Sequence, residues 1–144
     1  MPLTSPPDRV YPLEHERIQA EGVVVMSDQT TTVAALRDLM RGFVAERDWQ
    51  QFHSPKNLAM AAGVEAAELM EHFLWIDNDE SRRQMQDPAK LAPVADEIAD
   101  VVGVCLALCN ALGLDLSEVF ADKMVRNAQK YPADRARGRY RLED

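Results

Sequence analysis

Two pairs of carboxylic acids are the residues of this chain best suited to chemistry. Glu65 and Glu68 form one pair, and Glu97 and Asp100 form the other. Residues three apart on a helix project from the same face, so each pair would present its acids as neighbours. Glu71 extends the first row by a further three positions. Two helices carrying such pairs on mostly apolar surfaces would bring several negative charges together.

No basic residue lies near either pair along the chain. Lys and Arg are absent from 57–81 and from 91–122. Carboxylates that meet without basic partners either take raised pKa values or hold a cation between them. Oxygen-only ligands favour a hard ion, so the sequence predicts a Mg²⁺ site, with Mn²⁺ as a substitute. The alternatives are a solvated acidic face or salt bridges between helices. A ferritin-like di-metal centre is disfavoured, because its Glu-x-x-His pairs are absent.

The sequence around the first pair predicts two helices. Apolar residues recur at helical spacing from Thr31 or Thr32 to about Asp48. Ser54 before Pro55 is typical of a helix start, and we expect the second helix to run from there to near Ile76.

Further helices are predicted around the second pair of acids. We expect a short helix over 80–86, a long one from Pro88 to about Leu112, and a last one from Asp115 to about Lys130. Pro93 should kink the long helix or mark its first turn. Gly113 should cap the end of the long helix. No strand pattern is present, so we predict an all-α, four-helix bundle. The long helix is apolar nearly all round after Asp100, which favours a homo-oligomer, a homodimer or homotetramer.

Length and composition limit the remaining possibilities. The chain has 144 residues and a net charge of −8, which suits one domain and argues against a nucleic-acid partner. The longest apolar run, 101–109, is too short to span a bilayer. Its cysteines, Cys105 and Cys109, are expected to be small buried hydrophobes in a reducing, cytoplasmic setting. Residues 1–30 are expected to form a flexible extension, 31–132 the helical domain and 133–144 a basic, irregular tail. Met26 is a plausible alternative start, so whether residues 1–25 belong to the native protein is left open.

The acid pairs and their flanks resemble a known family. Glu65-x-x-Glu68 followed by Glu97-x-x-Asp100 is similar to the two-part signature of the MazG-like nucleoside triphosphate pyrophosphohydrolases. The flanking elements resemble the dCTP pyrophosphatase branch of that family. These elements are Glu46-Arg-Asp-Trp49-x-x-Phe52-His53-x-Pro55-x-Asn57-Leu58, then Trp75, and then Lys123-Met-x-x-Asn127-x-x-Lys130-Tyr131-Pro132.

The resemblance implies an all-α oligomer that uses Mg²⁺ to cleave a nucleoside triphosphate between its α- and β-phosphates. The products would be a nucleoside monophosphate and pyrophosphate. It makes the four acids metal ligands and catalytic residues. It also implies nucleotide-binding residues: Trp49, Trp75, Asn127 and Tyr131 around the nucleotide, Lys123 near its phosphates, and His53 and Asn57 in the matching flank. For His53, a role as a turn cap is an equal alternative, and for the tryptophans a place in the core.

Two positions depart from the vertebrate enzymes of that branch. Met40 stands where they carry His, and Val104 where they carry Tyr. Both regions line the nucleotide pocket of the branch, so base preference is left open between dCTP and a related or modified nucleotide. The rival prediction is a non-catalytic helical interaction module that keeps the bundle and binds partners through its apolar helix.

Overall fold

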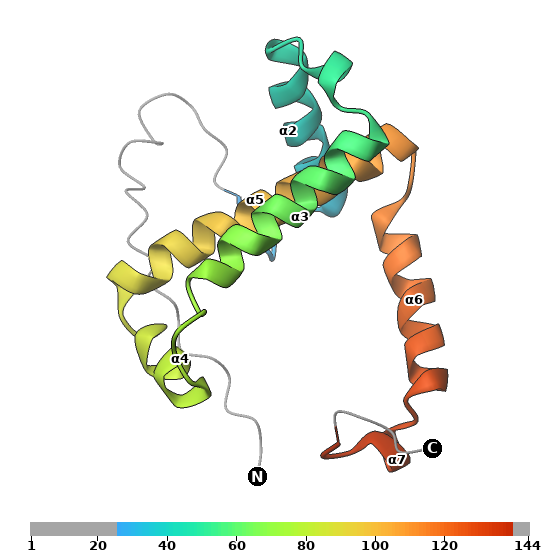
Figure 1. The fold of residues 1–144 in the computed structure, drawn as a ribbon. Coiled ribbons are helices and arrows are strands. Elements are labelled where there is room, and N and C mark those ends of the chain that lie inside the picture. Colours follow the sequence, from blue (N-terminus) through green and yellow to red (C-terminus); the bar gives the residue numbers. More distant parts are fainter. Residues whose placement is uncertain (1–25, 140–144) are drawn as a thin grey trace. The chain divides into compact units, whose positions relative to one another are not determined.

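The computed structural model describes residues 26–139, and within them the regular structure is entirely helical (Figure 1). The predicted all-α class is confirmed. The helices are α2 (Val33–Glu46), α3 (Pro55–Glu71), α4 (Asn78–Gln84), α5 (Pro88–Leu112), α6 (Leu116–Lys130) and α7 (Ala133–Ala136), with the 3-10 turn η2 (Gln50–Phe52) before α3. Of the expected N-terminal extension and basic tail, 1–25 and 140–144 lie outside the described residues.

Side-chain caps begin the main helices where the sequence predicts them. The Thr32 hydroxyl accepts the Ala35 N–H at 3.1 Å, and the Ser54 hydroxyl accepts the Asn57 N–H at 3.2 Å. The Asp115 carboxylate accepts the Glu118 N–H at 3.0 Å. Each bond satisfies a donor that the first turn of a helix leaves free, so each fixes where its helix begins.

A glycine ends the long helix as predicted. Gly113 has φ +64°, a conformation that glycine adopts without strain. The next N–H, that of Leu114, then donates back to the Cys109 carbonyl at 3.0 Å. This bond satisfies one of the carbonyls that the end of α5 leaves free.

Two expectations are wrong, and one of the two alternatives for Pro93 is excluded. α3 ends at Glu71, not near Ile76, and the chain turns with the Phe73 N–H donating to the Met70 carbonyl at 3.0 Å. The residues beyond it include two aromatics and Ile76, which are weaker helix formers than the Ala, Leu and Glu before them. Pro93 does not mark the first turn of α5, which begins at Pro88. The tail is not irregular throughout, because α7 forms one helical turn after Pro132.

The chain divides into two compact units. Among the described residues, 26–31 and 59–104 belong to the first, and 32–58 and 105–139 belong to the second. In the first unit the C-terminal part of α3 and the N-terminal part of α5 lie side by side, with α4 on the connection between them (Figure 1). In the second unit the end of α5 is hydrogen-bonded to α2.

The buried apolar core is small. It consists of Val94 in the first unit and of Val44, Leu58, Leu106, Ala107 and Cys109 in the second. The expectation that both cysteines are buried is wrong for Cys105, which is exposed, while Cys109 is buried. α6 has no buried residue, and Phe120 and Val125 on it are 61% and 60% exposed. Large apolar surfaces of this kind mark interaction sites.

None of the helices in the described part is by itself long and apolar enough to cross a membrane. α5 and α6 would pass only as a pair, and the chain bends by 104° between them.

Candidate metal centre

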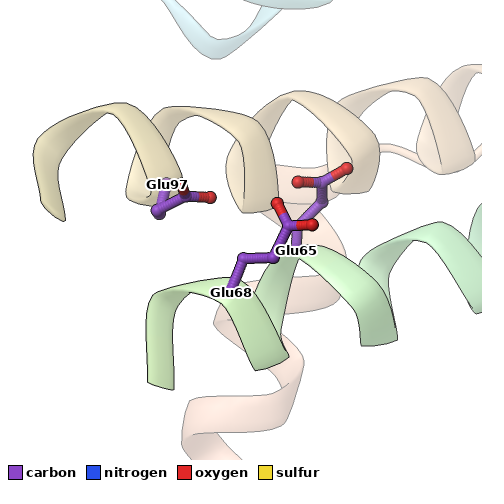
Figure 2. A group of neighbouring side chains, drawn as sticks. All are labelled: Glu65, Glu68 and Glu97. Carbon is purple, nitrogen blue, oxygen red and sulfur yellow. The ribbon is translucent and has the colours of Figure 1, made fainter. Parts of the chain in front are cut away.

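Three of the four predicted acids come together in the first unit. Glu65 and Glu68 project from α3 and Glu97 projects from α5, and one carboxylate oxygen of each lies within 4.8 Å of those of the other two. Figure 2 shows the three side chains in the space between the two helices. The three-residue spacing puts the α3 acids on one face, and the antiparallel neighbour supplies the third acid.

The fourth acid, Asp100, is not one of the three whose oxygens meet within that distance. It is nevertheless close enough to affect them electrostatically. Burial first, and then the charges of Glu68, Asp100 and Glu97, raise the pKa of Glu65. Both causes disfavour the ionised carboxylate, so the cluster is electrostatically unfavourable as it stands.

No basic side chain relieves this repulsion among the described residues. The ion pairs found in 26–139 are Arg41 with Asp38, Arg47 with Glu46, Arg82 with Asp79 and Arg83 with Glu80, none of which involves the acid cluster. Within the described residues, the acids of the cluster therefore do not form the interhelical salt bridges of the alternative prediction.

One carboxylate oxygen of the cluster lacks a hydrogen-bond donor among the residues described. The Oε2 atom of Glu97 is buried and has no hydrogen-bond partner in the described part of the chain. A buried charged oxygen without a partner costs free energy that a ligand would recover. A hard divalent cation fits this position, because its preferred ligands are carboxylate oxygens. Glu65, Glu68 and Glu97 could therefore hold such an ion.

His53 and Asn57, two of the predicted nucleotide-binding residues, lie on either side of the start of α3 in the second unit. His53 is half-buried and borders a cavity of about 300 Å³ in the second unit, which Met40 also lines. Val104 is half-buried and is not among the residues that line this cavity. Asn57 donates its side-chain amide to the Phe52 carbonyl at 3.0 Å, which ties η2 to the start of α3.

The two tryptophans have different surroundings. Trp49 is 44% exposed and packs edge-on against Phe43, with ring centroids 5.9 Å apart. Trp75 follows the end of α3 and is 93% exposed. A large aromatic side chain in this state is not part of the core, which removes that alternative for Trp75.

The remaining candidates lie at the end of the chain. Lys123 is exposed and Asn127 is half-buried, both on α6. Tyr131 caps α6 and is 45% exposed, with the Lys130 ammonium 5.1 Å from the centre of its ring. None of the three lines the cavity or joins the acid cluster.

The prediction from sequence missed Arg41 and Asn110, which also line the cavity of the second unit. One signal was available. Asn110 is the single polar side chain in the apolar run 101–112. A lone amide in such a run indicates a specific hydrogen-bonding partner.

Comparisons with known proteins agree with this geometry. The model of the MazG-like family matches residues 60–141, which contain all four acids. Two curated relatives are dCTP pyrophosphatase 1 of Mus musculus, 38% identical over 107 residues, and dCTP pyrophosphatase 1 of Homo sapiens, 39% identical over 106 residues. Each alignment covers 74% of this chain, and the chain spans 63% and 62% of the length of these relatives.

A solved structure has a similar fold. The crystal structure of a pyrophosphatase from Archaeoglobus fulgidus matches with a TM-score of 0.66 and 33% sequence identity. The match covers 76% of this chain and 98% of that one. The match of the family model over more than half of the sequence, together with these relatives, shows that the chain belongs to the MazG-like family.

Proposed function

We propose that this protein is a Mg²⁺-dependent nucleoside triphosphate pyrophosphohydrolase. Its substrate would be dCTP or a related or modified nucleotide, and its products the monophosphate and pyrophosphate. The observation that carries the proposal is the meeting of Glu65, Glu68 and Glu97 without a basic partner in the described residues. The names of the relatives, dCTP pyrophosphatase 1 and a pyrophosphatase, support the reaction class.

The proposed ligands of Mg²⁺ are Glu65, Glu68, Glu97 and Asp100, and Mn²⁺ would substitute. When bound, the cation supplies positive charge that offsets the triphosphate and the charge developing on the bridging oxygen. Without it, a chain of net charge −8 would repel such a substrate.

The chain's own carboxylates would also handle the proton. Water attacks the α-phosphorus, the bond from that phosphorus to the bridging oxygen breaks, and pyrophosphate leaves. Glu68 and Glu71 are both exposed on α3 and available to accept the proton of the attacking water. Trp49, Trp75, Asn127 and Tyr131 would surround the nucleotide, with His53 and Asn57 nearby and Lys123 near the phosphates.

We also propose that the protein acts as a homodimer or homotetramer in the cytoplasm. The support is the exposed apolar surface of α6, where Val119 and Met124 are 43% and 41% exposed beside Phe120 and Val125. The same surface would serve the rival function, a non-catalytic interaction module. The two functions differ in whether any triphosphate is hydrolysed.

A substrate panel tests the proposal. Purified protein with Mg²⁺ is given individual deoxynucleoside and ribonucleoside triphosphates, and monophosphate and pyrophosphate are measured. We expect hydrolysis by the wild type, loss of at least about a hundredfold in kcat for Glu68→Gln, and wild-type rates for Asp96→Asn, a matched change of an exposed acid outside the cluster. Near-normal turnover by Glu68→Gln would refute the role of the cluster, and no hydrolysis by the wild type would favour the interaction module.

A further inference from the structure

Positive charge gathers at the end of the described chain, in the second unit. Residues 126–139, the basic segment, contain five basic side chains: Arg126, Lys130, Arg135, Arg137 and Arg139. The single acid in this range is Asp134. All five basic residues are exposed, and among the described residues none of them takes part in an ion pair. The proposed function uses none of the five.

The backbone holds the last two arginines on one turn. Arg137 has φ −59° and ψ 120°, Gly138 has φ +74°, and the Arg139 N–H donates to the Ala136 carbonyl at 3.0 Å. These are the features of a type II turn, whose third position needs a positive φ and therefore favours glycine. Arg135 precedes the turn on α7. The three arginines thus leave an ordered stretch of backbone within five residues of one another.

An exposed aromatic ring lies in the sequence between the two groups of basic residues. Arg126 and Lys130 are four apart on α6 and so share one face of it. Tyr131 follows at the end of the helix, 45% exposed, with the Lys130 ammonium 5.1 Å from the centre of its ring. Cations that follow a phosphate backbone, together with a ring on which a base stacks, are typical of proteins that bind single-stranded nucleic acid.

The net charge of −8 argues against a nucleic-acid partner only where charge is spread evenly along the chain. Here the excess of acids lies in residues 1–125, and the basic segment has the opposite sign. A charge acts over only about 10 Å at 0.1 M salt. A bound strand therefore responds to the local excess of cations and not to the net charge of the chain.

An anionic lipid surface is the other polyanion that offers phosphates. Residues 132–139 contain no large apolar side chain that would enter a bilayer. Stable attachment to lipid takes a second signal besides basic residues, and the exposed apolar residues of α6 are assigned above to the interface between copies. Arginine also suits phosphodiesters, because its planar guanidinium donates two parallel hydrogen bonds to one phosphate.

We propose that the basic segment is a binding surface for single-stranded nucleic acid, which it contacts through the phosphates and hence without sequence preference. This inference goes beyond the proposed function and does not rest on it.

The test measures binding of the full chain to a labelled oligothymidylate of about 20 nucleotides by fluorescence anisotropy, between about 50 and 200 mM salt. The wild type is compared with a glutamine triple variant: Arg135→Gln, Arg137→Gln and Arg139→Gln. A lysine triple variant at the same positions keeps the charge. The matched control removes equal charge from exposed positions of the first unit: Arg82→Gln, Arg83→Gln and Lys90→Gln.

For the wild type we expect the logarithm of the association constant to fall against the logarithm of salt concentration with a slope of about −3.5, the value for five phosphate contacts on a single strand. The glutamine triple variant should have a slope of about −1.4 and bind at least about ten-fold more weakly at 50 mM salt. The lysine triple variant should keep the wild-type slope, and the control should match the wild type. Hydrolysis of dCTP should be unchanged in the glutamine triple variant, because its three positions lie outside the proposed catalytic residues.

Three results would overturn the inference. One is no saturable binding by the wild type, and another is an equal slope for the wild type and the glutamine triple variant. The third is binding to vesicles of phosphatidylserine and phosphatidylcholine that the glutamine triple variant loses while it still binds the oligonucleotide. If circular dichroism shows that the glutamine triple variant does not fold, the lysine triple variant and the wild-type slope decide, and a slope near zero counts against the inference.

Discussion

Glu65 on α3 and Glu97 on α5 bring carboxylate oxygens within 4.8 Å of each other, although each comes from a different helix. Burial, and then the negative charges of Glu68, Asp100 and Glu97, raise the pKa of Glu65. A fold that keeps such an arrangement has a use for it that outweighs the cost. We propose that in this chain that use is the binding of a divalent cation.

The raised pKa of Glu65 predicts how the metal-free protein responds to pH. An acid whose pKa is higher in the folded than in the unfolded state makes the folded protein bind more protons between the two values. The free energy of unfolding therefore falls as pH rises through that window, which begins at the ordinary value of 4.5. Glu65→Gln removes this penalty. In EDTA the variant should be more stable than the wild type at pH 7, and the difference should shrink below pH 4.5.

Urea denaturation at the two pH values measures this difference. Adding Mg²⁺ at pH 7 should reverse the order, because the wild type gains binding free energy that the variant lacks. A metal-free Glu65→Gln that is less stable than the wild type at pH 7 would contradict the electrostatic account of the cluster.

Trp75 is predicted to bind the nucleotide without stabilising the fold. At 93% exposed it contacts little of the protein, so Trp75→Leu should change the free energy of unfolding by no more than about 0.5 kcal/mol. Stacking on a base is worth roughly 1–3 kcal/mol, so nucleotide affinity should fall about ten-fold. Calorimetric titration with a non-hydrolysable triphosphate measures it. Trp49→Leu is the comparison, since loss of its packing on Phe43 should lower stability as well. Unchanged affinity in Trp75→Leu would remove Trp75 from the site.

Self-association is predicted to depend on the exposed face of α6. Phe120 and Val125 are each about three-fifths exposed, at 61% and 60%. Phe120→Glu combined with Val125→Glu should yield monomers, because an interface would have to bury both new charges. Light scattering coupled to size-exclusion chromatography gives the mass. A wild type that runs as a monomer of 16.2 kDa would contradict the proposal.

Local signals in the sequence were enough to predict most helix starts. Thr32, Ser54 and Asp115 cap their helices by bonds that span three residues, and such short-range chemistry can be read from the sequence itself. The end of α3 could not be read in this way, since no glycine or proline follows Glu71 to mark it. The helical pattern of the sequence continues to Ile76, which is why the predicted end was wrong.

The acid cluster was predictable and the cavity was not. Equal spacing on two stretches without Lys or Arg predicted that Glu65, Glu68, Glu97 and Asp100 would meet, and the first three of these acids do. The bond between Arg37 and Asn110 joins positions 73 apart, and no local rule predicts such a pairing. It depends on how α2 packs against the end of α5, which only the folded chain reveals.

Direct binding of Mn²⁺ tests the central claim, that the acids of α3 and α5 hold a divalent cation. Calorimetry would compare the wild type with Glu97→Gln, which removes the charge of the carboxylate with the unpartnered oxygen, and with Asp96→Asn, its exposed neighbour. We predict saturable binding to the wild type, at least about ten-fold weaker binding to Glu97→Gln, and unchanged binding to Asp96→Asn. Equal affinity for the wild type and Glu97→Gln, or no binding to the wild type, would contradict the account.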